Sequence, residues 1–273
     1  LRDCDDGLKK QFNLTTNDGV FWDPGNQWYV YWLDRDNSVH GNNLVIPVNF
    51  MAIAYGICDD RKRISAVLER TEKEMQKENL FAWPLCMFSF AAGEGMEFQY
   101  PFPNYENGDI FLAWGEVGVR AYASYDPRIA VKYIERLLAK YTEDGLAFQR
   151  YSRLTQKGMG DDILANNCLT VVGLYRNIYG IQPKYNRIFL DPHITAELEG
   201  TIVHYQRKGQ RYLIKLNPGG CEVSIERFEL TASRPFGVNA EGGKLEYFQG
   251  SANRPSMILG VDRTVSVHVR IEE

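Results

Sequence analysis

The strongest constraint on the fold is a change in hydrophobic patterning near residue 180. Before this point, apolar residues recur at intervals of three and four, which is typical of helices. After it, short β-rich runs alternate with Gly-containing turns, which is typical of strands. In the run Val265–Ile271, apolar and polar residues alternate, so one face is predicted to be buried. We therefore expect a helical domain, residues 1–182, followed by a β domain, residues 183–273.

The helical part contains two kinds of predicted helix. Segments that are apolar on nearly every side are predicted to be inner helices, at 44–57, 110–123 and 163–179. Segments with one apolar stripe are predicted to be outer helices, at 1–12, 64–77 and 128–141. Asp126 and Pro127 form a cap and first-turn proline for the last of these. Pairing outer with inner helices gives helical hairpins around a common axis, a toroid. The predicted fold is mainly α followed by β, with a small antiparallel β-sandwich after the toroid.

Composition and motifs exclude several classes of function. The formal net charge is −4 and the basic residues form no cluster, so nucleic acid is not an expected partner. The longest apolar stretch, 81–92, is interrupted by Pro84 and is too short to cross a bilayer. The five cysteines are widely spaced and include no C-x-x-C pair, which argues against a zinc site. No phosphate-binding Gly loop or Ser nucleophile elbow is present, and we expect no metal and no cofactor.

Polar residues gather in the loops that precede the three predicted inner helices. Their members are His40, Asn42, Tyr105, Glu106, Asn107, Asp109, Asp161 and Asp162. In a toroid these loops share one end, near the positive ends of the helix dipoles. An Asp at a helix start is often only a cap, and that alternative stays open for Asp109 and Asp162. Glu106 follows the proline- and aromatic-rich stretch 101–105 and has little need to cap a helix.

Aromatic residues make up 13% of the chain, enough both to fill a core and to stack on sugars. We expect Trp22, Trp28 and Trp32 to line a cleft. Trp83 and Trp114, within apolar runs, are expected to lie in the core. Carboxylates, amides and aromatic rings around a cleft are typical of sites for neutral polyols and for glycosidic chemistry.

Four segments together resemble the C-terminal part of six-hairpin, (α/α)6 glycosidases: 21–29, 105–111, 172–183 and 188–192. Their pattern is similar to that of inverting glycoside phosphorylases of the cellobiose phosphorylase type, over about residues 15–200. The resemblance implies an (α/α)6 toroid followed by a β-sandwich, and it places the family's conserved glutamate at Glu106. Only three inner and three outer helices are predicted here, half of what a six-hairpin ring needs. We therefore expect a missing N-terminal segment or a second chain to complete the toroid.

Departures from the family's motifs favour hydrolysis over phosphorolysis. Asp109 stands where the family has a second glycine, and Ala113 stands where it has a phosphate-contacting histidine. Residues 161–167 contain no Gln-Gly pair like the one that helps to bind phosphate in that family. The stretch 3–7 imitates the general-acid motif, but we interpret it as a helix surface. The general acid is therefore expected outside this chain.

The sequence thus predicts the C-terminal half of an inverting glycoside hydrolase acting on an oligo- or polysaccharide. Glu106 is the predicted general base, with Asp109 or Asp162 as substitutes. The predicted sugar-binding residues are His40, Asn42, Asn107 and Asp161 for hydroxyl groups, and Trp22, Trp28 and Tyr105 for stacking. In such enzymes the acid and the base stand roughly 6.5–9.5 Å apart.

Other functions remain open at this stage. A polysaccharide lyase could use His40, Asn42, Tyr105 and Arg150 around a uronate. A glycoside phosphorylase is a further alternative. In a non-catalytic carbohydrate-binding or structural fragment, the loop carboxylates would serve as caps and hydrogen-bond acceptors.

Overall fold

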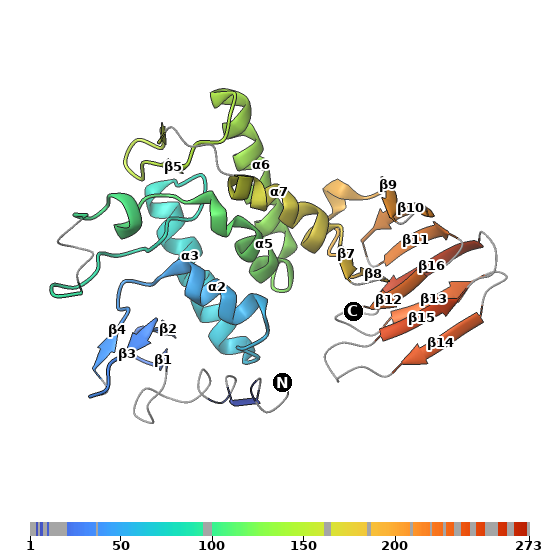
Figure 1. Cartoon of the computed structure of the whole chain (residues 1–273), viewed down its shortest axis with the longest axis horizontal. Coiled ribbons are helices and arrows are strands. Elements are labelled where there is room, and N and C mark those ends of the chain that lie inside the picture. Colours follow the sequence, from blue (N-terminus) through green and yellow to red (C-terminus); the bar gives the residue numbers. More distant parts are fainter. Residues whose placement is uncertain are drawn as a thin grey trace. The chain divides into compact units, whose positions relative to one another are not determined.

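The computed structural model describes most of the chain up to residue 218 and the strands that follow (Figure 1). The described residues are 4, 6–7, 10, 21–36, 38–94, 100–160, 165–184, 187–207, 210–218, 220–225, 228–231, 236–240, 244–248, 256–260 and 265–271. The chain divides into two compact units: unit 1, residues 1–173, and unit 2, residues 174–273. The domain limits predicted from the sequence, 1–182 and 183–273, stay a prediction.

Unit 1 is helical. Its described helices are α2 (Ile46–Ala54), α3 (Arg61–Glu78), α5 (Gly115–Ala123), α6 (Pro127–Asp144) and α7 (Leu169–Gly173). Helix α5 packs against α2, α6 and α7 and is the most enclosed of the five (Figure 1). Two glycines permit this packing. A Cβ on Gly118 would lie 2.5 Å from the Trp83 ring, and a Cβ on Gly173 would lie 2.8 Å from Val119.

Local sequence explains where the two long helices begin and end. Asp60 caps α3 by accepting hydrogen bonds from the backbone N–H groups of Lys62 and Arg63. Asp126 caps α6 in the same way, with Pro127 in the first turn, so the predicted cap is confirmed. Both helices end at a residue in the left-handed conformation, Asn79 for α3 and Gly145 for α6.

Unit 1 also contains short two-stranded pairings. Its hairpins are β1 (Trp22–Asp23) with β2 (Trp28–Tyr29), β3 (Trp32–Leu33) with β4 (Val39–His40), and β5 (Arg150–Tyr151) with β6 (Gly158–Met159). The buried Asn49 of α2 holds β2 by exchanging hydrogen bonds of 2.8 and 3.0 Å with the backbone of Tyr29. Isolated bridges then join Pro84 to Ile110 and Ile110 to Tyr151. These bridges bring three segments that are far apart in sequence side by side.

Unit 2 is mainly β. It begins with the π-helical turn η5 (Leu174–Ile178), the hairpin β7 (Ile181–Lys184)–β8 (Arg187–Leu190) and the short turn η6 (Ala196–Leu198). A five-stranded antiparallel sheet has the order β13 (Phe236–Ala240), β16 (Val265–Ile271), β11 (Gly220–Ile225), β10 (Gln210–Asn217) and β9 (Thr201–Arg207). A three-stranded sheet has the order β12 (Phe228–Thr231), β15 (Ser256–Gly260) and β14 (Lys244–Phe248). All of these pairings are antiparallel.

The fold class predicted from the sequence is wrong. In the residues that the structure describes, α2, α6 and α7 pack against α5, the helices form no (α/α)6 toroid, and the sheets form no β-sandwich. Four of the six sheets are two-stranded hairpins. A segment that is apolar on all sides is predicted to be buried, but its pattern does not say by what. Helix α5 is buried by packing against α2, α6 and α7, and an (α/α)6 toroid would have buried it equally well.

Several predicted helices are also shorter than expected. In the segment 110–123, α5 begins only at Gly115, after the single turn η3 (Leu112–Trp114). In the segment 163–179, residues 165–178 are helical, but only Leu169–Gly173 (α7) is α-helical; it lies between the 3-10 turn η4 (Ala165–Cys168) and the π-helical turn η5. Most of the predicted helix 1–12 lies outside the described residues. None of the described helices is long and apolar enough to span a membrane.

Candidate functional site

The segment 100–111 holds four of the predicted site residues and is built around a single turn, η2 (Tyr105–Asn107). Tyr105 has a φ of +48°, a left-handed conformation that is uncommon for a bulky residue. Gly108 follows with a φ of +131°, and a Cβ there would lie 3.0 Å from the Cα of Pro103. The turn is closed by hydrogen bonds of 2.8 Å from the backbone N–H of Tyr105 to Asp109 Oδ2 and from the backbone N–H of Asp109 to the carbonyl of Tyr105.

Asp109 is the centre of a buried polar network. Its Oδ2 also accepts a hydrogen bond of 3.1 Å from Arg150 Nε, and its Oδ1 accepts one of 3.1 Å from the backbone N–H of Arg153. The residue is 3% exposed. Since both carboxylate oxygens are occupied, Asp109 is poorly placed to take a proton from water. It does not cap an inner helix either, because α5 begins only at Gly115.

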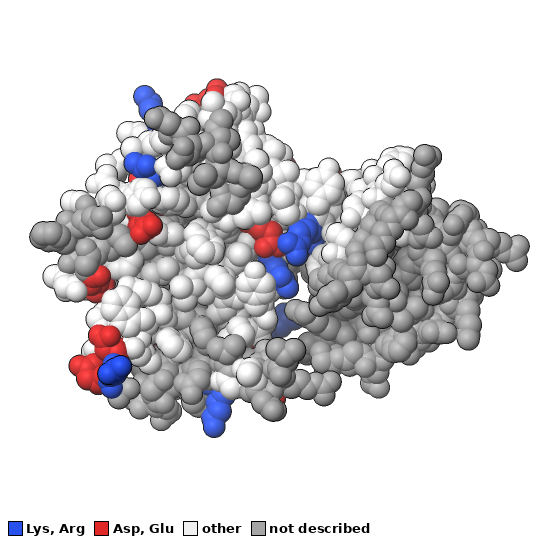
Figure 2. Space-filling model, viewed as in Figure 1, with Lys and Arg blue, Asp and Glu red and all other residues white. Residues whose placement is uncertain are grey.

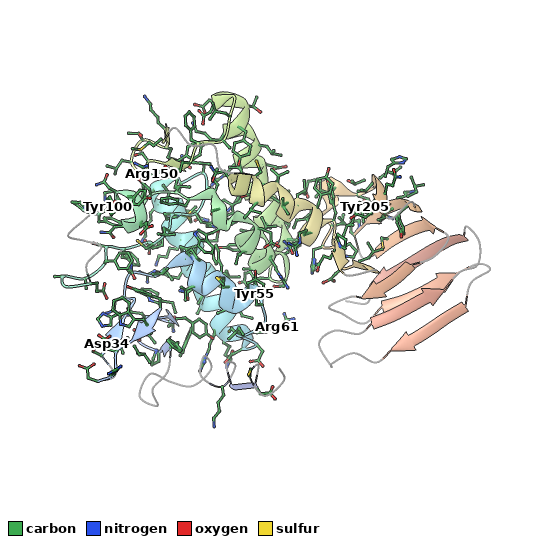
Figure 3. The ribbon with its side chains drawn as sticks, in the orientation of Figure 1. Asp34, Tyr55, Arg61, Tyr100, Arg150 and Tyr205 are labelled. Carbon is green, nitrogen blue, oxygen red and sulfur yellow. The ribbon has the colours of Figure 1, made fainter. Side chains whose placement is uncertain are left out.

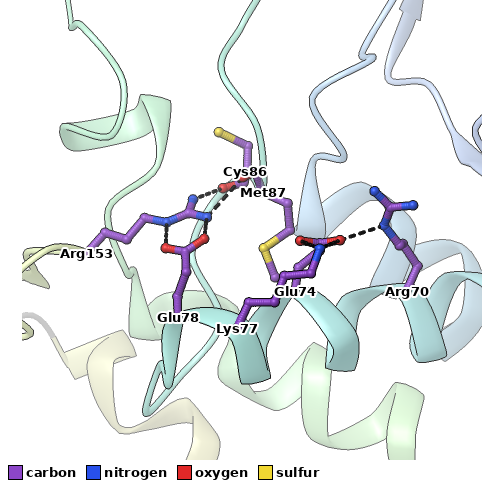
Figure 4. A network of polar contacts seen from close by, with 7 residues as sticks. All are labelled: Arg70, Glu74, Lys77, Glu78, Cys86, Met87 and Arg153. Carbon is purple, nitrogen blue, oxygen red and sulfur yellow. Dashed lines mark hydrogen bonds and ion pairs between the residues drawn. The ribbon is translucent and has the colours of Figure 1, made fainter.

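Arg153 extends this network to the end of α3 (Figure 4). Its guanidinium forms a two-point ion pair with Glu78, and donates to the carbonyl oxygens of Cys86 at 2.9 Å and Met87 at 3.0 Å. Burial leaves 2% of the Arg153 side chain exposed, whereas 41% of the Glu78 side chain is exposed. The guanidinium also lies 4.9 Å from the centre of the Phe102 ring. The segment 100–111 is therefore anchored by an ion pair to Arg150 and, through the backbone of Arg153, to the residue that pairs with Glu78 of α3.

Glu106 differs from its neighbours because its carboxylate is uncommitted. The side chain is half-buried, and it makes no hydrogen bond or ion pair with any described residue. Its neighbour in sequence, Tyr105, belongs to a group of partly exposed aromatic rings. The ring of Tyr105 is 4.6 Å from that of Tyr100 and 5.5 Å from that of Phe111, and the Arg150 guanidinium lies 5.0 Å from the Tyr105 ring (Figure 3). The backbone around Glu106 is fixed while its carboxylate stays available.

Asn107 is fully buried and its amide is used inside the protein. The nitrogen donates to the carbonyl of Tyr100 at 2.9 Å and to Ser89 Oγ at 3.3 Å, and the oxygen accepts from the backbone N–H of Phe90 at 3.1 Å. These bonds hold the flanking segment against η2. They leave the Asn107 side chain no exposed surface for a sugar hydroxyl.

His40 lies in a second cluster, on the hairpin β3–β4. Its Nε2 is 2.9 Å from Asp34 Oδ2, its Nδ1 is 3.1 Å from Glu94 Oε1, and its ring stacks on that of Trp32 at 4.2 Å. Hydrogen bonding to Asp34 is the largest effect on the pKa of His40 and raises it; desolvation lowers the pKa, and hydrogen bonding to Glu94 raises it further, so the pKa is raised overall. Hydrogen bonds from His40 and Trp32 lower the pKa of Asp34. Both ring nitrogens of His40 thus face protein carboxylates rather than open solvent.

The remaining predicted binding residues are dispersed. Asn42 is exposed and accepts a hydrogen bond of 3.3 Å from Asn26. Trp22 and Trp28, on the hairpin β1–β2, are 7% and 3% exposed, so they pack in the core. Trp28 stacks near Phe88 and donates to the carbonyl of Gly41 at 3.2 Å. Asp161 and Asp162 lie outside the described residues.

The tryptophan predictions are partly reversed. Trp83 is in the core, at 7% exposed, as predicted, whereas Trp114, which was also expected there, is 40% exposed. A small apolar hollow beside Trp114 and Phe111 has a cavity volume of about 10 Å³, room for about one water molecule. A sugar ring does not fit in that hollow, so a sugar bound here would lie on the aromatic surface.

The structure therefore brings together Tyr105, Glu106, Asn107, Asp109 and Arg150, which the sequence named only for the lyase alternative, and it adds Arg153. No hydrogen bond or ring contact between described residues joins His40 or Asn42 to Glu106. Sequence reasoning missed Arg153 and the rings of Tyr100 and Phe111. The signal that could have found the rings is the density of aromatic residues between positions 100 and 111.

The surface charge and the comparison with known proteins do not identify a ligand for this site. On the face drawn in Figure 2, the Lys and Arg side chains of the described part are dispersed and form no single basic patch. Among the described residues, no group of three or more His, Cys, Asp or Glu side chains could hold a metal ion. No model of a known protein family matches the chain, and no curated protein matches it. The function is therefore argued from the segment 100–111 itself.

Proposed function

We propose that this protein binds carbohydrate on the aromatic surface around Glu106 and hydrolyses a glycosidic bond with inversion. Glu106 is the general base that activates water, and the general acid comes from an upstream segment or from a second chain. The observation that supports this most is the contrast within one turn. The side chains of Asn107 and Asp109 are fully occupied, whereas the Glu106 carboxylate has no partner among the described residues.

The chemistry of a general base fits this arrangement. A base must be ionised, reachable by water and held by a rigid backbone. The closed turn between Tyr105 and Asp109 supplies the rigidity, and the partial exposure of Glu106 supplies the access. The rings of Tyr100, Tyr105 and Phe111 supply flat apolar faces for a sugar to stack on.

The test is Glu106→Gln, measured in the full-length protein. Turnover of a panel of nitrophenyl glycosides and oligosaccharides should fall by about 10²–10⁴, because the amide keeps the size of the side chain but cannot take a proton. The melting temperature should stay unchanged. The matched control is Glu135→Gln on the exposed face of α6, which should leave both quantities unchanged. Normal turnover in Glu106→Gln would remove this residue from the reaction.

The products separate hydrolysis from the other candidate reactions. Inverting hydrolysis gives a reducing sugar whose first-formed anomer, observed by NMR, is opposite to that of the substrate. Inorganic phosphate should leave the rate unchanged, because Ala113 cannot donate a hydrogen bond to phosphate. Phosphate-dependent release of a sugar 1-phosphate would indicate a phosphorylase, and an ultraviolet-absorbing unsaturated product would indicate a lyase. Binding without turnover would indicate a carbohydrate-binding protein.

A further inference from the structure

The histidine on the hairpin β3–β4 has an unusual pair of neighbours. His40 Nε2 faces Asp34 Oδ2 at 2.9 Å and His40 Nδ1 faces Glu94 Oε1 at 3.1 Å. A neutral imidazole has one N–H donor, whereas an imidazolium has two. Carboxylate oxygens only accept when they are ionised. Both contacts are hydrogen bonds at the same time only when His40 is protonated on both nitrogens.

The two carboxylates differ in their surroundings. The Asp34 side chain is 52% exposed and also accepts hydrogen bonds from Trp32 Nε1 at 3.1 Å and Ser38 Oγ at 3.3 Å. The Glu94 side chain is 7% exposed, and its second oxygen accepts from the backbone N–H of Ala91 at 2.6 Å. A buried carboxylate that loses its cation is destabilised much more than an exposed one.

The other groups around His40 do not titrate near neutral pH. Asp36, which bonds to Ser38, has a pKa lowered by those hydrogen bonds. Tyr31 has a pKa raised to about 12, first by desolvation and then by Glu94. Trp32 stacks on the imidazole and has no titratable proton in this range. Of the described groups around this clamp, His40 is therefore the one that changes charge near neutrality.

We propose that His40 is a pH-responsive clamp between the hairpin β3–β4 and the turn 91–94. As an imidazolium it ties Glu94 to the hairpin. When it loses a proton, the remaining N–H stays with Asp34 on the same hairpin, and Glu94, without a cation in a buried position, turns toward water and releases the turn.

The clamp acts on the segment that borders the candidate site. Residues Ser89, Phe90 and Tyr100, on either side of the turn, are bonded to the buried Asn107 amide. Release of the turn 91–94 therefore frees residues 91–94, directly after the anchor at Phe90. This inference does not depend on the proposed function, since it concerns protonation and backbone protection in the free protein.

The experiment follows His40 and the turn by NMR in the full chain, with no sugar added. Ring ¹⁵N shifts should show both His40 nitrogens protonated at low pH and only Nε2 protonated at high pH. The transition should lie above the ordinary histidine pKa of 6.5. Over the same pH range, the hydrogen-exchange protection factor of the Ala91 amide should fall by about tenfold or more. A single protonated nitrogen at low pH, or unchanged protection across the transition, would overturn the clamp.

Two variants distinguish the clamp from general loosening. In Glu94→Gln, the side-chain oxygen can still accept from Ala91 and the amide can donate to the neutral Nδ1 of His40. Protection of Ala91 should then persist at high pH. In the control Asp36→Asn, on the same hairpin, the pH dependence should stay as in the wild type. If Glu94→Gln loses protection at the same pH as the wild type, His40 is not the clamp. Failure of the clamp experiment would not affect the proposal that Glu106 is the general base. Normal turnover in Glu106→Gln would not affect the proposal that His40 is a clamp.

Discussion

Two loops of unit 1 are both aromatic and polar: the loop 100–111 leads into η3 and α5, and the loop 31–43 leads into α2. The first is held around a buried carboxylate, and the second around a histidine. In the first, buried Asp109 is bonded to Arg150 and to the backbone of Arg153. In the second, His40 is held by Asp34, whose side chain is 52% exposed, and by Glu94. The arginines keep their charge at any physiological pH, whereas the histidine does not. The contacts that hold the first loop are therefore independent of pH near neutrality, whereas those that hold the second loop depend on the protonation of His40.

The asparagines of the two loops differ in the same way. Asn107 is fully buried and has four neutral partners, whereas Asn42 is exposed and accepts one hydrogen bond from Asn26. Similar residue types in similar loops thus have different roles, because burial determines how much a lost hydrogen bond costs. Substitutions at matching positions in the two loops test this comparison.

The largest effect is expected for Asp109→Asn. The amide oxygen can accept, but the amide nitrogen would face a donor, either a backbone N–H or Arg150 Nε, and the buried ion pair would be lost. We expect the free energy of unfolding to fall by about 3 kcal/mol, measured by urea denaturation. Glu106→Gln, three positions earlier, should change it by less than about 0.5 kcal/mol. A loss of about 1 kcal/mol or less in Asp109→Asn would instead indicate a simple helix cap.

A smaller effect is expected for Asn107→Ala. This change removes the fully buried Asn107 amide and leaves the partly buried N–H of Phe90 and carbonyl of Tyr100 without this partner, so the free energy of unfolding should fall by about 2 kcal/mol. Asn42→Ala is the matched control and should cost less than about 0.5 kcal/mol, because water replaces its exposed contact. Equal losses in the two variants would contradict the difference between the loops.

The smallest effect is the pH dependence that the second loop adds to stability. The pKa of His40 is raised in the folded state, so its stabilisation is fully present below the unfolded value, near 6.5, and is lost as pH rises through the folded pKa. The pKa of Asp34 is lowered, so its stabilisation is present above the unfolded value, near 3.8, and is lost as pH falls through the folded pKa. The melting temperature should therefore decline above neutral pH, and His40→Asn should remove that part of the decline. An identical pH profile for His40→Asn and the wild type would exclude His40 as its source.

Parts of this molecule could be predicted because they depend on neighbours in sequence. The cap at Asp126, the proline after it and the apolar stripe predict α6, since a helix places residues three and four apart on one face. The helical segments around α2 and α5 and the strand Val265–Ile271 follow from hydrophobic periodicity in the same way. Glu106 could be separated from Asp109 in part, because its proline-rich approach gives it no capping role.

The sequence by itself determined the long helices α3 and α6 and alternating strands such as β16, because hydrogen bonding within a helix and alternation along a strand are local. Only the tertiary structure decided that α2, α6 and α7 pack against α5, that Trp114 is exposed while Trp22 is buried, and that Asp109 serves as an anchor. The partners that decide the last point are distant in sequence. Asp109 meets Arg153 across 44 residues and His40 meets Glu94 across 54. The burial of a charge depends on such non-local neighbours, and no periodic pattern in the sequence specifies them.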